Sequence, residues 1–178
     1  MGNQYAKFLK LIFTLSQDNR SFKALSEDIK TCIYNLDRND FLEIVKQIRM
    51  IPEKIKTSST EEKLYSKASD IVLARCFNEL GLEANAIDQR GNNADVICKS
   101  NHHGYTLVAD SKTFRLSRTA KNQKDFKIST LSKWRGMENE YAVLVAPYFQ
   151  YPSVASQIYS SSLTEQVCLF HGSICSFY

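Results

Sequence analysis

The first third of the chain shows a helical pattern of hydrophobic and polar positions. Apolar residues recur three or four positions apart over residues 5–50, which is typical of amphipathic helices. Turn-forming residues at 17–19 and 37–40 divide this stretch, and Pro52 follows it. The pattern predicts three short helices. Their apolar positions are Phe8, Leu11, Ile12 and Leu15, then Leu25, Ile29, Cys32, Ile33 and Leu36, then Phe41, Ile44, Val45 and Ile48.

A longer helix is predicted from Ser59 to Leu80. Its apolar residues again recur with helical spacing, and Gly81 suits the left-handed backbone that often ends a helix. Ser59 and Glu62 have the spacing of a capping box, in which the serine caps the first turn and the glutamate reaches back to the cap amide.

A β-hairpin is predicted after this helix. Residues 94–99 and 105–112 are rich in β-forming side chains, and residues 100–104 between them form a turn. Directly opposed residues of an antiparallel pair share a face, with Cβ atoms about 5 Å apart. A turn centred on His102 and His103 pairs Lys99 with Thr106, Ile97 with Val108 and Asp95 with Asp110.

The rest of the chain adds two more strands. Residues 140–146 form an apolar run that Pro147 stops, which predicts a buried strand. A weaker helical pattern spans 154–163, and 166–170 predicts a last strand. From residue 61 onward the order is therefore helix, three strands, helix, strand. This order favours an α/β fold with a mixed sheet, preceded by a short helical N-terminal region.

The open end of the hairpin gathers charged side chains. Because side chains alternate along a strand, Lys112 points to the same face as Asp110, and the register brings Asp95 there too. Two carboxylates facing each other cost free energy unless a positive charge lies between them. Mg²⁺ prefers oxygen ligands, and Lys112 could orient or deprotonate a water beside it. The alternative is that these are ordinary solvated residues at strand ends.

Glu62 has two possible roles. It can serve the capping box with Ser59, or it can be a further carboxylate that the helix directs towards the hairpin, where it would hold metal or water. The local pattern by itself favours the cap.

A basic segment, residues 115–135, follows Lys112 directly. Charge runs are usually solvated faces, but a polyanion bound along this one would lie across the carboxylate pair. Ser117, Asn122 and Asp125 are among its polar side chains, which are able to contact base edges. Its cations are Arg115, Arg118, Lys121, Lys124, Lys127, Lys133 and Arg135.

The composition fits one globular domain. The chain has 178 residues, of which 43% are hydrophobic, and its net charge of +4 permits an anionic partner without requiring one. Five widely spaced cysteines without a C-x-x-C pair predict reduced thiols in a cytoplasmic protein. No secretory signal or membrane span is predicted.

The combination of an acid before one strand, an acid-x-lysine at the end of the next and a preceding helix glutamate resembles the PD-(D/E)-x-K nuclease core. Within that superfamily the chain is similar to the HindIII type II restriction endonuclease family, from about residue 21 to residue 170. Ser111 stands where that family favours alanine. The stretches that carry the resemblance are 58–60, 62–64, 66–68, 70–74, 89–92, 107–110, 114–127, 141–144, 146–147, 149–152 and 156–158.

The resemblance implies a homodimeric, Mg²⁺-dependent enzyme that cuts double-stranded DNA within the palindrome AAGCTT, after the first adenine. It implies that Asp95 and Asp110 are metal ligands, Lys112 is the catalytic lysine and Glu62 is the helix carboxylate. The chemistry would be phosphodiester hydrolysis, and a two-fold symmetric dimer would match a palindromic site. The expected DNA contacts are Arg115, Ser117, Arg118, Thr119, Lys121, Asn122, Lys124, Asp125 and Lys127.

The resemblance also implies a division of the chain into a helical N-terminal region at 1–52 packed on a nuclease core at 53–170, with a divergent tail at 171–178. The family continues further with a largely helical C-terminal region, so a truncated chain is expected. One alternative is an inactive relic that binds DNA weakly through the basic segment. Another is a purely structural or interaction module, in which the hairpin charges are incidental.

Overall fold

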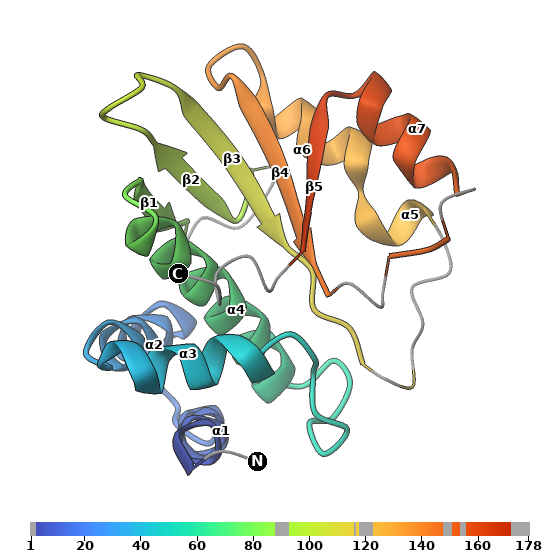
Figure 1. Cartoon of the computed structure of the whole chain (residues 1–178). Coiled ribbons are helices and arrows are strands. Elements are labelled where there is room, and N and C mark those ends of the chain that lie inside the picture. The colour runs from blue at the N-terminus through green and yellow to red at the C-terminus, as the bar shows by residue number, and fades with distance from the viewer. Residues whose placement is uncertain are drawn as a thin grey trace.

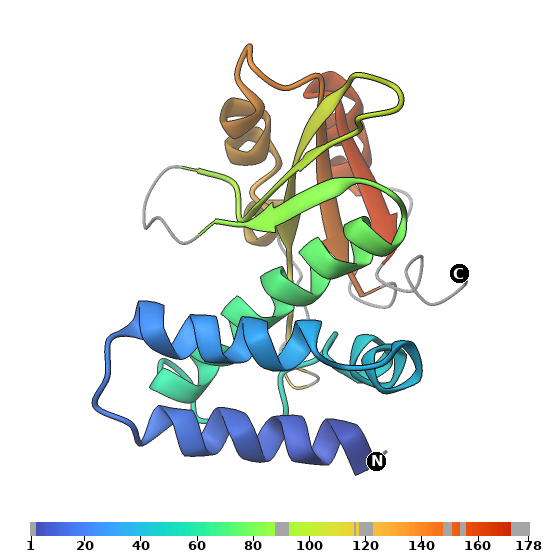
Figure 2. The ribbon, with the colours of Figure 1, turned by 90° about the vertical axis from the view of Figure 1, so that its left-hand side faces the viewer.

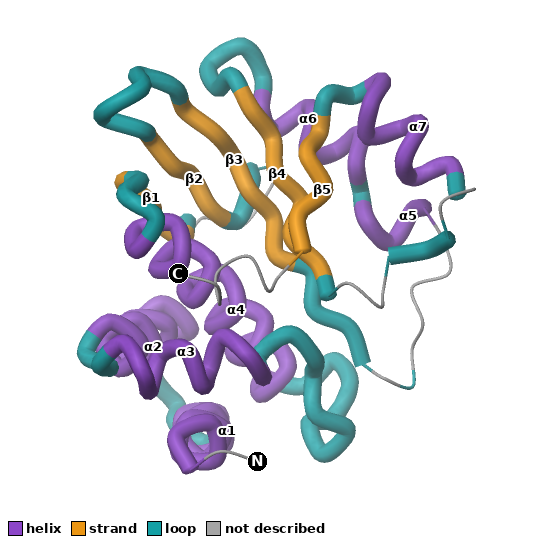
Figure 3. The backbone as a smooth tube through the Cα atoms, in the orientation of Figure 1, coloured by secondary structure: helices purple, strands orange, loops and turns teal. Residues whose placement is uncertain are grey.

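The structure, a computed structural model, has the α/β fold that the sequence predicts. It describes residues 3–87, 93–115, 117, 123–147, 151–153 and 156–171. Figures 1 and 3 show the arrangement of helices and strands. In chain order the elements are α1 (Asn3–Ser16), α2 (Phe22–Tyr34), α3 (Arg38–Gln47), α4 (Thr60–Glu79), β1 (Glu83–Ala86), β2 (Val96–Lys99), β3 (Thr106–Ser111), α5 (Gln123–Phe126), α6 (Ile128–Arg135), β4 (Tyr141–Ala146), α7 (Gln157–Thr164) and β5 (Val167–His171).

The strands form one mixed sheet in the order β1-β2-β3-β4-β5. The first three strands pair antiparallel, whereas β3, β4 and β5 run parallel. Parallel neighbours require a crossover, and here α5 and α6 connect β3 to β4 while α7 connects β4 to β5. The predicted mixed sheet is confirmed.

Helices cover both faces of the sheet (Figure 1). Alternation along β4 shows why: Val143 and Val145 pack with α4 on one face, whereas Ala142 and Leu144 pack with α5, α6 and α7 on the other. Strand β4 is therefore apolar at almost every position, as its sequence predicts.

The three N-terminal helices pack against α4 on the side away from the sheet (Figure 2). Their apolar stripes meet the buried residues Leu64, Tyr65 and Ala68 of α4. A hydrogen bond of 2.7 Å joins the hydroxyls of Tyr5 and Tyr65, and Tyr65 also donates to the carbonyl of Met50 at 2.8 Å. The three predicted short helices are confirmed, and they fix α4 from behind.

Three elements were not predicted: β1, α5 and α6. Strand β1 consists of Glu-Ala-Asn-Ala, residue types that are poor in strands, and it exists because it pairs with β2 along its whole length. Helices α5 and α6 lie inside the segment that the sequence marked only as basic. Buried Phe126, Ile128 and Leu131 show the apolar face that was overlooked there.

The hairpin register is as predicted: Ile97 pairs with Val108 and Lys99 pairs with Thr106. The same register continued by one step places Asp95, which precedes β2, opposite Asp110 of β3. The turn is closed by hydrogen bonds between Ser100 and its neighbours, and Gly104 has a positive φ of 73°. The open end of the hairpin is therefore held in one definite register.

The four cysteines within the described ranges, Cys32, Cys76, Cys98 and Cys168, are free thiols, as predicted. The fifth, Cys175, lies outside those ranges. Among the described helices, none combines the length and the apolar character that crossing a membrane would need.

Candidate active site

Asp95 and Asp110 meet at the open end of the hairpin. Asp110, the second-to-last residue of β3, has no exposed surface, and Asp95 is half-buried just before β2. Both carboxylate oxygens of Asp110 are buried, and apart from the Lys112 ammonium and the Asp95 carboxyl group no described residue donates to them. Buried oxygens of this kind are rare in folded proteins, and they indicate a ligand, an ion or a functional group that titrates.

The electrostatics of the pair favour a proton or a cation between the two groups. Burial, a hydrogen bond to the Asp110 side chain and the negative charge of Asp110 together raise the pKa of Asp95 to about 7. Two ionised carboxylates cannot hydrogen-bond to each other, so that hydrogen bond requires one proton shared by the pair. A divalent cation would replace that proton and satisfy both groups at once.

Helix α4 adds a third carboxylate, Asp70, which the sequence analysis did not single out. Burial, followed by the charges of Asp95 and Asp110, raises the pKa of Asp70 well above its ordinary value. The signal was present in the sequence: Lys67 and Asp70 are charged residues within the otherwise mostly apolar, buried middle of α4. Charged side chains at such positions are seldom tolerated unless they are paired or functional.

Two lysines balance these acids. Lys112 forms an ion pair with Oδ2 of Asp110, and its side chain is 17% exposed. The backbone amide of Lys112 donates to the carbonyl of Val145 at 2.8 Å, which extends the β3–β4 pairing past the end of β3. Lys67 of α4 is buried, and its positive charge acts on both Asp70 and Asp95. The predicted grouping of Asp95, Asp110 and Lys112 on one face is what the structure shows.

A direct contact ties α4 to the strand that carries Asp110 and Lys112. The hydroxyls of Ser69 and Ser111 hydrogen-bond at 2.8 Å. Because side chains alternate along β3, Ser111 points towards α4 while Asp110 and Lys112 point to the other face. The serine that stands in place of an alanine thus anchors the strand to the helix beneath it.

The donor set fits one divalent cation. Within the described residues, no group of three or more His, Cys, Asp or Glu side chains is arranged to hold a metal ion. Mg²⁺ does not need such a cage, since it is usually held by one or two carboxylates, and the rest of its shell is water and substrate phosphate. Asp95 and Asp110 supply two carboxylates side by side, and the oxygens of Asp110 are buried, so the residues present fit such a cation.

Glu62 lies at the start of α4, eight residues before Asp70, which corresponds to about 12 Å along a helix axis. Its backbone amide donates to the hydroxyl of Ser59 at 3.2 Å, and its Oε2 accepts from the amide of Ser58 at 2.6 Å. Its Oε1 accepts from Arg115 at 2.8 Å. Glu62 therefore performs the capping role, while Asp70 is the α4 carboxylate whose charge interacts with Asp95 and Asp110.

Arg115 is buried, with 9% of its surface exposed. Besides its ion pair with Glu62, it donates to the carbonyl of Pro52 at 3.4 Å. These contacts fasten the chain after β3 to the start of α4 and to the segment before it. The guanidinium is thus directed into the protein, and this position does not favour the phosphate contact expected of Arg115.

The other expected DNA contacts are only partly described. The backbone amide and hydroxyl of Ser117 donate to Glu53, at 3.2 Å and 2.9 Å. Asp125 is half-buried in α5, and Lys127 is exposed before α6 with a positive φ of 50°. Arg118, Thr119, Lys121 and Asn122 lie outside the described residues, as does the side chain of Lys124.

Sequence comparison places this site in a known context. The HindIII restriction endonuclease family matches the chain over residues 6–178. The chain belongs to that family. The match extends over 171–178, the segment that the sequence analysis had set apart as divergent. It also takes in every residue of the candidate site.

One member of the HindIII family is similar to nearly the whole of this chain. The chain is 54% identical over 164 residues to the type II restriction enzyme HindIII of Haemophilus influenzae. The alignment covers 92% of this chain and 54% of that enzyme. The chain thus spans about half the length of the relative that it matches.

Proposed function

We propose that this chain carries the catalytic core of a type II site-specific deoxyribonuclease that hydrolyses double-stranded DNA with Mg²⁺. The observation that carries the proposal is the fully buried Asp110, whose carboxylate pairs with Lys112 and lies against the carboxyl group of Asp95. Membership of the HindIII restriction endonuclease family supports the same reaction.

The side chains divide the reaction between them. Asp95 and Asp110 would hold Mg²⁺, which when bound supplies positive charge to the attacking water and to the scissile phosphate. Lys112, kept at the site by its ion pair with Asp110, would orient that water and donate to a phosphate oxygen. Asp70 interacts electrostatically with both acids, and a bound cation would favour its ionised form.

The substrate proposed is the palindrome AAGCTT, cut after the first adenine, and the acting form is a homodimer. A two-fold symmetric protein presents the same site to both strands of a palindrome. Exposed Lys127 and the basic residues of 117–127 would lie along the DNA backbone. A DNA substrate would place the reaction in the cytoplasm.

A plasmid digest tests the proposal. Purified protein with Mg²⁺ should cut a plasmid that contains AAGCTT into discrete fragments, and it should leave a plasmid with a single changed base in that site intact. Asp110→Asn should lose at least about a hundredfold in rate, because it removes a metal ligand. Asp28→Asn is the matched control, since it removes an exposed carboxylate that only pairs with Arg20 on the surface.

A folded but inert wild-type protein would contradict the proposed activity. Salt-dependent DNA binding without cleavage would then support the alternative, a nuclease core that only binds DNA weakly, because phosphate contacts weaken steeply as salt rises. Equal cleavage by wild type and Asp110→Asn would contradict the assigned site itself.

A further inference from the structure

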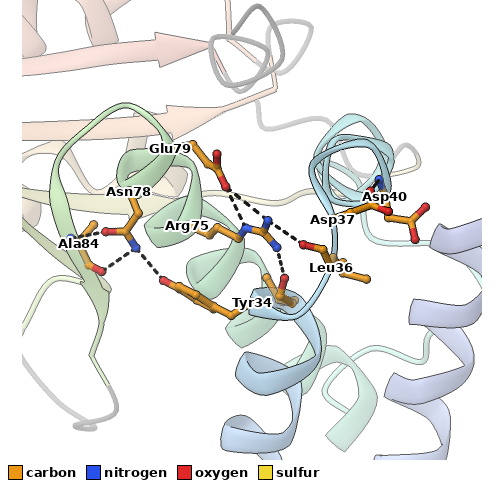
Figure 4. A network of polar contacts seen from close by, with 9 residues as sticks. Tyr34, Leu36, Asp37, Asp40, Arg75, Asn78, Glu79 and Ala84 are labelled. Carbon is orange, nitrogen blue, oxygen red and sulfur yellow. Dashed lines mark hydrogen bonds and ion pairs between the residues drawn. The ribbon is translucent and has the colours of Figure 1, made fainter.

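Helix α4 holds the edge strand β1 by two polar contacts, one at each end of the strand. Near the start of β1, the side chain of Asn78 accepts from the amide of Ala84 at 2.8 Å and donates to its carbonyl at 3.1 Å (Figure 4). Just beyond the end of β1, the ammonium of Lys67 donates to the carbonyl of Ile87. Both contacts join α4 to the backbone at β1, but only Lys67 also acts on the carboxylates.

The Lys67 contact continues directly to Asp95. The amide of Ile87, the residue whose carbonyl accepts from Lys67, donates to the backbone carbonyl of Asp95 at 2.8 Å. One residue thus joins the helix on one side to the backbone of a candidate metal ligand on the other. Two hydrogen bonds in series connect Lys67 with the point where Asp95 enters the site.

Burial makes this contact hard to replace. Lys67 is 9% exposed, and an interior ammonium is costly unless its donors and its charge are used. Here the ammonium of Lys67 donates to the carbonyl of Ile87, and its positive charge acts on Asp70 and Asp95. A residue that only shaped the core would not need a cation at this position.

We propose that Lys67 is a positioning residue, which holds the junction of β1 and β2 so that Asp95 faces Asp110 at metal-binding distance. The inference rests on the proposed function and adds a residue to it. Removal of Lys67 has two opposing effects. Loss of a positive charge alone would strengthen cation binding, whereas displacement of Asp95 would weaken it. Positioning dominates, because Mg²⁺ requires nearly ideal octahedral geometry from its ligands.

Calorimetric titration of the DNA-free protein with Mg²⁺, repeated with Mn²⁺, tests this. Lys67→Met should lower the metal affinity by about tenfold to a hundredfold, the usual cost of losing a group that orients a ligand. The kcat for cleavage should fall while the KM for DNA stays close to that of wild type. Lys67→Arg keeps a charged donor and should retain more of the affinity than Lys67→Met.

Asn78→Ala is the matched control, because it removes the other contact between α4 and β1. It should lower thermal stability yet leave metal affinity unchanged. If Lys67→Met fails to fold, Lys67→Gln, a shorter neutral donor, takes its place with a smaller expected loss of affinity.

Three results would overturn the inference. Metal affinity in Lys67→Met equal to or above that of wild type would show that Lys67 acts only as a charge. An equal loss of affinity in Asn78→Ala would show that any loosening of β1 suffices. Wild-type protein that binds neither metal would refute the proposed function, and the role of Lys67 would fall with it.

Discussion

Two regions of helix α4 differ in how completely their polar side chains find hydrogen-bond and ion-pair partners. In the last turns, Arg75 and Asn78 meet a partner for almost every donor (Figure 4). Near the middle, Asp70 interacts electrostatically with Asp95 and Asp110, and the positive charges that act on these carboxylates are those of Lys67 and Lys112. The first region holds neighbouring elements together, whereas the second gathers acidic side chains whose charges oppose one another.

Arg75 shows what a matched network does. Its guanidinium donates to the carbonyls of Ile33 and Leu36 at the end of α2, and it lies 4.1 Å from the ring centre of Phe41. A cation at a helix C-terminus is favoured by the helix dipole. Glu79, one turn later on α4, accepts from the same guanidinium at 3.3 Å. This network therefore contributes to stability and is not part of the candidate active site.

The carboxylate region lowers the stability of the folded protein. Like charges brought together out of water raise the free energy of the folded protein, and a site built this way is stable only because the surrounding structure holds it. The contrast predicts that mutations in the first region lower stability and leave metal binding unchanged. Removal of a carboxylate in the second region should instead raise stability and weaken metal binding.

The largest expected change in stability is from Arg75→Met. Two buried carbonyls, those of Ile33 and Leu36, would lose their donor, and the free energy of unfolding should fall by about 3 kcal/mol. Urea denaturation measures this. Metal affinity, measured in the same preparation, should match wild type, and a parallel loss of metal binding would break the comparison between the two regions.

Asp110→Asn should change stability in the other direction. In protein freed of metal by a chelator, replacing one of three crowded carboxylates should raise the free energy of unfolding by about 1 kcal/mol, although Lys112 loses its ion-pair partner. Added Mg²⁺ should then stabilise wild type but not the variant. Thermal melting with and without Mg²⁺ would show this, and a destabilised metal-free variant would contradict it.

Glu62→Gln sharpens the choice between the two roles of that residue. The substitution weakens the cap at Ser58 and removes the charge that pairs with Arg115, so we expect a loss of about 1 kcal/mol. Cleavage measured well below the melting temperature should remain within a few-fold of wild type. A loss as large as that of Asp110→Asn would return Glu62 to the catalytic group.

The last expected effect is a pH dependence of the metal-free protein. The pKa of Asp95 is raised from 3.8 to about 7 in the folded state, so the folded state binds the proton more tightly than the unfolded chain does. The resulting stability is complete below about pH 4 and is lost as the pH rises through about 7. Urea denaturation with chelator at about pH 5 and about pH 8 should show this decline, and Asp95→Asn should flatten it.

Local sequence rules determined the hairpin and the helices. A period of two and a turn at residues 100–104 place Ile97 opposite Val108, and a slip of one residue would have turned every side chain to the wrong face. Apolar residues three or four apart, with caps such as Ser59, similarly set helices α1 to α4 and α7. The positions of the opposed carboxylates and of Lys112 could be predicted from this alternation, because they depend only on the register of two adjacent strands.

Only the tertiary structure decided which residues join the hairpin from elsewhere in the chain. Asp70, Lys67 and Arg115 all reach their partners across elements, and no local period encodes the rotation or depth at which α4 packs on the sheet. Strand β1 likewise exists through its pairing with β2 and not through its own residue preferences. The sequence by itself therefore determined the pair of carboxylates, and long-range packing determined the third acid, the buried lysine and the inward-facing arginine that surround them.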